Sequence, residues 1–599
     1  MILVFGGTTE GRMAIKTLDE GVGQYYYSTR DGYQEVECAH GDLVSGEMSE
    51  TGMKEFCGTH NIKLLIDAAH PFAVNLHATV GKVARSLNLP AVRLERRYPD
   101  VNLENVIWCD SYEEAVEAME REGVKRLLAL TGVQTMTKLK SFWIRHDTYF
   151  RILDRRDSWD KAVAAGFPKD HLVFYEENDL SRIVSEVVPD AIITKESGLS
   201  GGFQEKIDVA LQYACKVYVV RRPTLPDNFI EVDGVHGLRR EVERIIPEFY
   251  SLHTGFTTGS CATAAAKAAL IGLLTGEKVS EIKFKIPEGE TMKMAVESVE
   301  ISHGTACASV IKDAGDDPDV TDGSRITVTV KYAFHPGIEF KGGKGVGTVT
   351  LPGLGLDVGE PAINVVPRQM MINELSSLYH GGLDVTVDLE DGDMLAAKTF
   401  NPKVGVVGGV SIIGTTGIVR PFSHEAFVES MRREVGVAIA LKCDRIVVNS
   451  GGKSERFMKT IYPELLPQAF IHYGNAIGDI MEIARDMNVK AVTIGLMLGK
   501  AVKLAEGHMD THSHRITFNK DFLKEVALGA QCSSEALNAI EQLNLARELP
   551  TLLNACDASR FFAAIGKLCH EHCADIYNGS LRTVLMADDG KILNTTSDL

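Results

Sequence analysis

The sequence predicts an N-terminal half of two α/β lobes with parallel sheets and a C-terminal half of α+β type. Over about the first 120 residues, short apolar runs such as Ile2–Phe5 and Leu64–Ala68 alternate with amphipathic stretches. This alternation is typical of parallel α/β sheets. Val124–Thr131, followed by Gly132, repeats the opening pattern of a strand and then a glycine, so a second lobe is expected there.

The motifs change near residues 240–253, and glycine clusters become dense beyond this stretch. A chain of 599 residues is long enough for three to five domains at roughly 100–200 residues each. We predict two Rossmann-like lobes at 1–120 and 121–249, the first of them binding a nucleotide. A third region at 252–599 is expected to fold independently of 1–249.

The composition and charge of the chain exclude several functional classes and cellular locations. The formal net charge is -18, which excludes general nucleic-acid binding. Eleven cysteines without a repeating spacing indicate reduced thiols in a cytoplasmic protein. Met1 leads directly into an apparent buried strand, and the longest apolar stretch, 404–419, is broken by glycines and shorter than the ~20 residues of a membrane span. We expect a soluble protein without membrane contact, and self-association into a homo-oligomer stays open.

The first motif joins the strand Ile2–Phe5 to a helix through a glycine turn. Such a turn lets backbone N–H groups approach a pyrophosphate at the helix N-terminus. The spacing differs from G-x-G-x-x-G, so another phosphate or a purely structural turn is the alternative. Arg30 favours NADPH because it could meet a 2′-phosphate, whereas the adjacent Asp31 favours NADH. The candidate cofactor-binding residues are Gly6, Gly7, Thr8, Thr9, Gly11, Arg12 and Arg30.

The opening Ile2–Arg12, ILVFGGTTEGR, resembles that of the precorrin-6A reductase family. Ala69 stands where that family usually has Thr. The resemblance covers residues 1–225 and implies hydride transfer from a nicotinamide cofactor to a macrocycle that carries many carboxylates. Further matches lie at Asp67–Ala73, Arg93–Arg96, Lys195–Gly198 and Glu205–Lys206.

Arginine and lysine side chains suit the carboxylates that this resemblance implies. Each of them is otherwise an ordinary surface charge. The catalytic candidates are His70 and Lys195; His70 could donate a proton, or it could cap the turn before Pro71-Phe72. The substrate-binding candidates are Arg93, Arg96, Lys195, Ser197, Gly198 and Lys206.

Three polar turns stand out in the C-terminal half: Gly255–Cys261 before an alanine-rich helix, the carboxylate-rich Asp313–Asp319, and Gly414–Gly417. Separately, each could be a helix cap, a solvated loop or a structural turn. We expect all three to line one pocket. The candidate residues are Thr257, Thr258, Gly259, Ser260, Asp313, Asp316, Asp317, Asp319, Gly414, Thr415, Thr416 and Gly417.

These turns, together with Pro361–Asn364 and Pro367-Arg368, resemble the anaerobic-type cobalt-precorrin-5B C1-methyltransferase family. The resemblance implies methyl transfer from S-adenosylmethionine to a corrinoid. The Asp-rich turn would then face the sulfonium, and the helix N-terminus a carboxylate. Ser260, Val365 and Met497 depart from the family pattern.

The combined hypothesis is a bifunctional enzyme of corrin-ring biosynthesis that uses NADPH or NADH and S-adenosylmethionine on small corrinoid substrates. Two alternatives stay open: an NAD(P)-dependent oxidoreductase on another acidic metabolite fused to a domain of unknown role, and a non-enzymatic corrinoid carrier. We predict no protein-held metal, although 508–514 and Cys569–Cys573 contain metal-ligand residue types. Cys261 is expected to have no covalent role.

Overall fold

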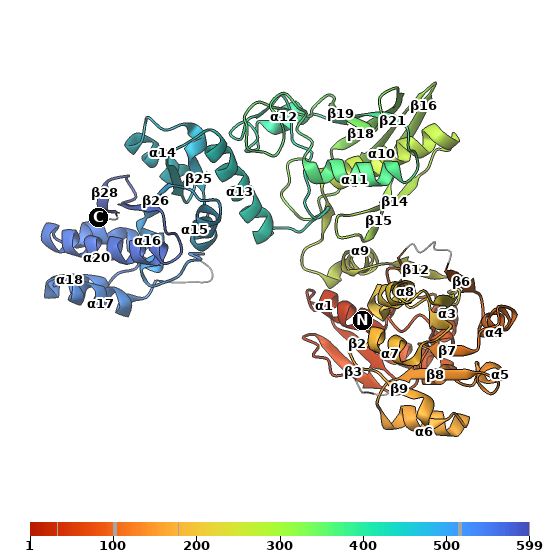
Figure 1. The fold of residues 1–599 in the computed structure, drawn as a ribbon. Helices are drawn as coiled ribbons and strands as arrows, with labels where there is room; N and C mark the ends of the chain where they lie inside the picture. Colours follow the sequence, from red (N-terminus) through yellow and green to blue (C-terminus); the bar gives the residue numbers. More distant parts are fainter. Residues whose placement is uncertain (31, 33, 100–104, 178, 513–517, 598–599) are drawn as a thin grey trace. The chain divides into compact units, whose positions relative to one another are not determined.

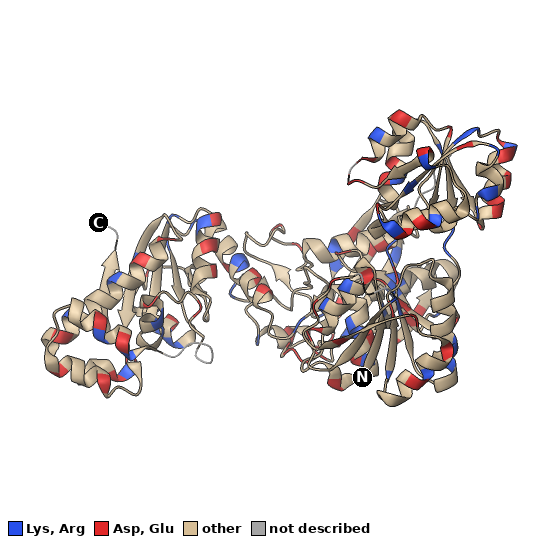
Figure 2. Cartoon of the chain, turned by 90° about the horizontal axis from the view of Figure 1, so that it is seen from below, with Lys and Arg blue, Asp and Glu red and all other residues tan. Residues whose placement is uncertain are grey.

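The computed structural model describes residues 1–599 except 31, 33, 100–104, 178, 513–517 and 598–599. The chain divides into two compact units. The first contains residues 1–253 together with 290–292, and the second contains 254–289 and 293–599. Basic and acidic residues are interspersed along both units (Figure 2).

The first sheet of the first unit has six parallel strands in the order β12-β5-β4-β1-β2-β3 (Figure 1). Helices α1 and α9 cover one face and α2 and α3 the other, so the central strands are apolar on both sides. The strands are β1 (Ile2–Phe5), β2 (Tyr25–Thr29), β3 (Gly41–Ser45), β4 (Leu64–Asp67), β5 (Ala91–Leu94) and β12 (Phe229–Val232). The helices are α1 (Thr9–Leu18), α2 (Glu50–Thr59), α3 (Val74–Leu87) and α9 (Val235–Ile245).

The second sheet is also parallel, in the order β6-β11-β10-β7-β8-β9. The prediction of two parallel α/β lobes is therefore confirmed. The strands are β6 (Val106–Cys109), β7 (Arg126–Ala129), β8 (Asp147–Ile152), β9 (Leu172–Phe174), β10 (Ala191–Lys195) and β11 (Lys216–Val220). The helices are α4 (Tyr112–Arg121), α5 (Lys140–Trp143), α6 (Arg156–Ala165), α7 (Leu180–Val187) and α8 (Phe203–Gln212).

The sheets set lobe limits that differ from the expected 1–120 and 121–249. Strand β6 lies before residue 120 but pairs with β11 in the second sheet. Strand β12 lies beyond residue 220 but returns to the first sheet beside β5. The limits of the two lobes are set by which strands pair, and the pairing joins segments that are distant in the sequence. A local apolar pattern predicts a strand but not the strand beside which it will lie.

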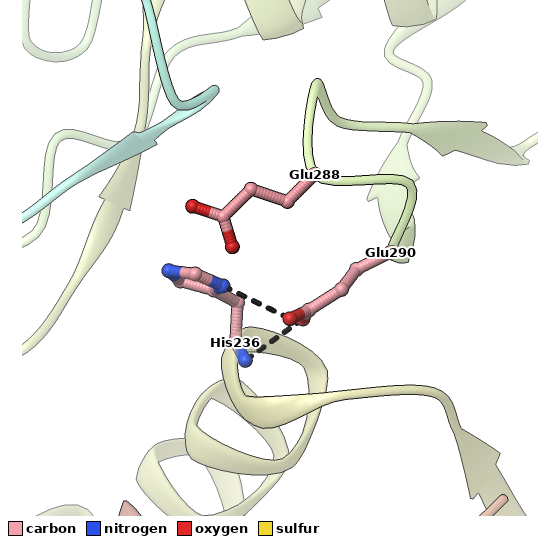
Figure 3. A group of neighbouring side chains, drawn as sticks. All are labelled: His236, Glu288 and Glu290. Atoms are coloured by element: carbon pink, nitrogen blue, oxygen red, sulfur yellow. Dashed lines mark hydrogen bonds and ion pairs between the residues drawn. The ribbon is translucent and has the colours of Figure 1, made fainter. Parts of the chain in front are cut away.

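Residues 290–292 complete the first unit by capping α9. The N-cap of α9 is Gly234, which has no side chain, and the Glu290 carboxylate accepts from the backbone N–H of Val235 (3.2 Å) and His236 (2.9 Å) instead. Figure 3 shows this carboxylate beside the His236 ring, 3.3 Å from Nδ1. Burial alone would raise the pKa of Glu290, and these hydrogen bonds outweigh burial and lower the pKa.

Replacing Glu290 with alanine is expected to destabilise α9 by about 1–3 kcal/mol, because buried N–H groups lose their acceptor. Hydrogen exchange of the amides of residues 235–237 in the full chain should quicken. The depressed pKa means that the cap stabilises the fold above about pH 4.5 and is lost as pH falls below that value. Glu281→Ala, at an exposed position, is the control; equal exchange in both variants would contradict the capping role.

The second unit begins with an α+β body. Helix α10 (Thr258–Thr275) packs against a five-stranded sheet in the order β16-β17-β18-β21-β19, in which β19 and β21 are parallel and the other pairs antiparallel. Within the described residues, α10 alone has the length and hydropathy of a membrane span, and 72% of it is buried inside the protein. The sheet strands are β16 (Ser298–Ser302), β17 (Thr305–Ile311), β18 (Arg325–Ala333), β19 (Ile338–Gly342) and β21 (Gly382–Leu389).

Shorter elements surround that sheet. They are β13 (Gly255–Phe256), β14 (Glu281–Lys285), β15 (Thr291–Ala295), β20 (Thr348–Val349), β22 (Val406–Val407), β23 (Ile418–Val419), α11 (Val365–Ser376) and α12 (Gly392–Ala396).

The unit ends in a second sheet of order β25-β24-β26-β27-β28, parallel except for β28. The C-terminal half thus mixes sheets and helices as expected, but the sequence analysis did not anticipate this largely parallel sheet. The strands are β24 (Ile446–Asn449), β25 (Phe470–His472), β26 (Ala491–Met497), β27 (Ser580–Met586) and β28 (Ile592–Ser597). The helices are α13 (His424–Ala440), α14 (Gly452–Ile461), α15 (Ile477–Asp486), α16 (Leu498–Ala505), α17 (Lys520–Gly529), α18 (Ser534–Glu541), α19 (Leu549–Leu552) and α20 (Ala555–Ala574).

Candidate functional site

The glycine turn after β1 closes around the hydroxyl of Tyr27. A Cβ on Gly6 would lie 2.0 Å from Tyr27 Oη, and one on Gly11 2.2 Å from it. Both positions therefore require glycine for close packing of the turn and α1 against β2. Thr8 caps α1, since its Oγ1 accepts from the Gly11 N–H at 3.0 Å and donates to Ala68 O at 2.6 Å.

Gly7 has φ +90°, and no atom of the described residues lies within 4 Å of its Cβ position, so the backbone is open to a ligand on that side. Its N–H donates to Tyr27 Oη (3.1 Å) and to Gln34 Oε1 (3.0 Å), and Gln34 Nε2 donates to Thr8 O (2.9 Å). Gln34 was not foreseen, because it belongs to no recognisable motif.

The N–H groups of Thr9 and Glu10, in the first turn of α1, have no intrahelical partner. Arg12 lies exposed on the same turn. Open space at Gly7, free donors and a nearby cation fit the pyrophosphate of a dinucleotide. Arg30 is exposed and lies 3.9 Å from Glu47, while Asp31 is outside the described residues.

The structure contradicts the substrate-binding role expected for Arg93. Its side chain is fully buried, with Nη1 donating to Asp67 Oδ1 and to Ala69 O, both at 2.8 Å, and Nη2 to Glu95 Oε1 at 3.4 Å. Arg93 holds the ends of β4 and β5 together and cannot face a substrate carboxylate.

Arg96 is buried as well and ties the two lobes of the first unit. Its Nε donates to Glu10 Oε2 in α1 (3.1 Å), and its Nη1 donates to Ser197 O after β10 (2.7 Å). A Cβ on Gly198 would lie 2.7 Å from Arg96 Cβ. The structure therefore gives Arg96, Ser197 and Gly198 contacts that position the lobes.

His70 follows β4, and its Nδ1 accepts from the Phe72 N–H at 3.1 Å. The ring therefore caps the turn, and in the neutral form its proton lies on Nε2. Burial, with the charges of Lys195, Arg96 and other cations, lowers the pKa of His70 to about 3. His70 is neutral near pH 7, so it is a weak proton donor.

Lys195, at the end of β10, and Lys206, in α8, form a lysine cluster with Lys138. Burial and neighbouring cations lower the pKa of both Lys195 and Lys206 to about 8. Lys195 Nζ lies 5.4 Å from the Phe72 ring centroid, and Lys206 Nζ donates to Gly201 O at 2.9 Å. Neither ammonium forms an ion pair with a carboxylate of the described chain. Uncompensated, half-buried ammonium groups suit an anionic ligand.

In the second unit the three polar turns lie side by side. The Phe256 N–H donates to Asp313 O (2.7 Å), the Thr257 N–H to Gly417 O (3.2 Å), and the Gly259 N–H to Ile413 O (2.9 Å). The Phe422 N–H donates to Asp317 Oδ1 at 3.1 Å. The turns are therefore adjacent, but of their residues only Gly414 and Thr415 line the pocket described below, so one pocket lined by all three turns stays a prediction.

Most polar groups of these turns bind the protein itself. Ser260 Oγ donates to Gly417 O (2.6 Å), Thr258 Oγ1 to Ile413 O (3.2 Å), and Thr416 Oγ1 to Ile418 O (2.9 Å). A Cβ on Gly414 would lie 2.2 Å from Thr257 Oγ1. The Thr/Gly motif therefore anchors the loop 413–417 on the N-terminus of α10.

Two carboxylates of the Asp-rich turn bind the protein itself, and the role of this turn at the sulfonium stays a prediction. Asp319 Oδ2 pairs with the buried Lys312 Nζ at 2.9 Å, and Asp313 Oδ1 accepts from the Gly315 N–H at 2.9 Å. Asp316 is exposed on the same turn. None of these carboxylates lines the pocket described next.

A pocket of about 300 Å³ lies beside the anchored loop, between α13 and the N-terminus of α11. Gly414 and Thr415 from the predicted set reach it, and the charged residues of α13 were missed because that helix carries no motif. The lining residues are Gly353, Leu354, Asn364, Val365, Val366, Pro367, Gly414, Thr415, Glu429, Arg432, Arg433, Gly436 and Met487.

Metal-ligand residue types meet on the five-stranded sheet at His335, Glu339 and Asp384. Lys341 Nζ lies 3.0 Å from Asp384 Oδ2, so a cation already neutralises this partly exposed group, and we assign no metal to it. Of the stretch 508–514 singled out in the sequence, residues 513 and 514 lie outside the described residues. Cys261 is fully buried in α10.

The fold and the sites define an enzyme of two parts. The first is a pair of α/β lobes of the kind that binds dinucleotides, and it carries the lysine cluster. The second has a pocket beside the loop 413–417, which the Thr/Gly motif anchors. Family models agree with this division. "Precorrin-6x reductase CbiJ/CobK" matches residues 1–242, "CbiD" matches 247–421, and "CbiD, C-terminal domain" matches 510–597. The chain belongs to the CbiJ/CobK reductase family in its N-terminal part and to the CbiD family of cobalt-precorrin-5B C(1)-methyltransferases in the rest.

Relatives of the second part include cobalt-precorrin-5B C(1)-methyltransferase of Geobacillus kaustophilus, 38% identical over 55% of this chain and 90% of its own length. The Burkholderia cenocepacia protein of the same name is 43% identical over 51% and 85%. Cobalamin biosynthesis protein CbiD of Archaeoglobus fulgidus is a similar solved structure, with 30% identity and a TM-score of 0.25. The match covers 45% of this chain and 84% of that protein. The solved structure of CobK precorrin-6A reductase has 19% identity and a TM-score of 0.34. The match covers 41% of this chain and 97% of that protein.

Proposed function

We propose that this chain is a bifunctional enzyme of corrin-ring biosynthesis, an NADPH-dependent reductase of precorrin-6A or its cobalt form and an S-adenosylmethionine-dependent C1-methyltransferase of cobalt-precorrin-5B. Membership of both families supports the pair of activities. The observation that carries the reductase assignment is the lysine cluster, Lys138, Lys195 and Lys206, at the carboxyl side of a parallel sheet, where α/β proteins bind ligands.

In the reductase, bound NADPH would supply the hydride. The N–H groups of Thr9 and Glu10, with Arg12, would hold its pyrophosphate. Lys195 and Lys206 would bind carboxylates of the macrocycle and so orient the ring; we assign them as substrate-binding residues. Arg96 would keep the lobes in register through Glu10 and Ser197. His70 would shape the turn beside Lys195.

In the methyltransferase, S-adenosylmethionine would supply the methyl group. The displacement depends mainly on in-line positioning, so the protein needs no covalent nucleophile. The Thr/Gly motif would hold loop 413–417 rigidly, and this loop would place Gly414 and Thr415 at the pocket.

Separate inactivation of the two parts tests the proposal. Gly6→Val should abolish reductase turnover and NADPH binding, because the new side chain would overlap the Tyr27 ring, while methyl transfer from S-adenosylmethionine to cobalt-precorrin-5B persists. Isothermal titration with NADPH, NADH and S-adenosylmethionine accompanies both assays. A wild-type chain that binds corrinoid but neither cofactor would instead be a carrier, and the proposal would fail.

A further inference from the structure

The pocket beside α13 has walls that the structure holds in place. A Cβ on Gly353 would lie 2.7 Å from Gly436 O, so loop and helix touch backbone to backbone there. Lys403 Nζ pairs with Glu434 Oε2 at 2.6 Å and ties the same helix to the loop before β22. Two separate contacts therefore fix α13 against the α+β body, and the pocket is formed before any ligand binds.

The charges in these walls are of both signs. Glu429, Arg432 and Arg433 lie three and four residues apart on α13 and share the face that lines the pocket. Arg433 Nε lies 3.4 Å from Glu429 Oε1, and Arg432 is exposed, without an ion pair within the described chain. A ligand bearing both an ammonium and a carboxylate matches the charges of both signs in this lining.

The other walls are apolar or small: Leu354, Val365, Pro367 and Met487, with Gly414 and Thr415 opposite α13. Pockets for drug-sized ligands measure about 300–1,000 Å³, and this one measures about 300 Å³. It can enclose the amino-acid end of a nucleoside ligand but not a carboxylate-bearing macrocycle.

We propose that this pocket binds the amino-acid end of S-adenosylmethionine, with Arg432 and Arg433 receiving its carboxylate and Glu429 its ammonium. This rests on the proposed methyltransferase function and adds to it the location of the methyl donor. The N-terminus of α11, where Asn364 makes no side-chain cap, adds backbone N–H donors to the wall across from α13. Thr415, which also lines the pocket, is exposed. Exposed Val365 and Ile413 lie at the same N-terminus and loop, where the macrocycle would approach the methyl group.

The proposal is tested by titration calorimetry on the full chain, which compares ligands that have the amino-acid carboxylate with one that lacks it. Wild type should bind S-adenosylmethionine and S-adenosylhomocysteine about 10–100-fold more tightly than decarboxylated S-adenosylmethionine, which lacks the carboxylate. In Arg433→Gln and Arg432→Gln the first two affinities should fall, and the affinity for the decarboxylated ligand should stay the same. Glu429→Gln should weaken all three ligands, because each keeps the ammonium.

Arg547→Gln, which removes an exposed cation outside the pocket lining, is the matched control and should bind like wild type. If both arginine variants keep wild-type affinity for S-adenosylmethionine while methyl transfer persists, the donor binds elsewhere and the pocket assignment is overturned. A rise in the KM for the corrinoid alone would mean that the pocket receives an arm of the macrocycle, which also overturns it. A wild-type chain that neither binds S-adenosylmethionine nor methylates would refute the proposed function itself.

Discussion

Replacing Gly414 with alanine is expected to lower methyl transfer by at least about 100-fold. The residue has φ +146°, and its Cβ would lie 2.2 Å from Thr257 Oγ1 and 2.5 Å from Thr257 Cβ. Backbone strain of this kind costs about 1–3 kcal/mol, and relieving the overlap would move loop 413–417 away from α10. A displacement of about 1 Å in a positioned reaction is enough for a 100-fold loss. Incorporation of labelled methyl groups into cobalt-precorrin-5B measures the effect.

Gly408→Ala is the control that separates the effect of steric overlap from the effect of backbone strain. Gly408 also has a positive φ, +81°, but no atom lies within 4 Å of its Cβ position. This variant should keep most methyl transfer, and both variants should keep reductase turnover, since the reductase residues lie in the other unit. Equal losses in the two variants would mean that the Thr257–Gly414 contact does not position the site.

Removing the ammonium groups of the lysine cluster is expected to have the second large effect. Lys195→Ala and Lys206→Ala should each raise the KM for precorrin-6A about 10–100-fold, because each removes a charge-assisted hydrogen bond to a carboxylate. The double variant should lose more than either single one, with little change in NADPH affinity. Steady-state reductase kinetics provide the measurement. Lys161→Ala, at an exposed position in α6, is the control.

The pH dependence follows from the lowered pKa of about 8 of both lysines. Below pH 8 both are charged and bind carboxylates; above it they lose protons, so wild-type affinity for the substrate should fall between pH 8 and 10. The double variant should lack this decline. Without substrate, the same charges destabilise the fold below pH 8, and this destabilisation falls as pH rises from about 8 to the ordinary lysine pKa of 10.5. Lys195→Met should therefore raise the melting temperature at pH 7. A flat wild-type pH profile would argue against carboxylate binding here.

The sequence alone predicts the two parallel α/β lobes, because buried parallel strands are short apolar runs between amphipathic helices, as at Ile2–Phe5 and Leu64–Asp67. It also determined both families, since motifs such as Gly6–Arg12 and Thr254–Ala262 are local strings. The convergence of three C-terminal turns was likewise anticipated from their composition.

The contacts of each polar side chain became known only from the folded structure. Arg93 and Lys195 are both cations at strand ends, but Arg93 is neutralised by Asp67 and Glu95, while Lys195 forms no ion pair with a carboxylate of the described residues. Sequence spacing does not contain these long-range pairings. The same reason applies to Asp319, which pairs with the buried Lys312, and to Arg433, which lines the pocket from a helix without any motif. Burial and charge compensation are set by how the chain folds around each residue.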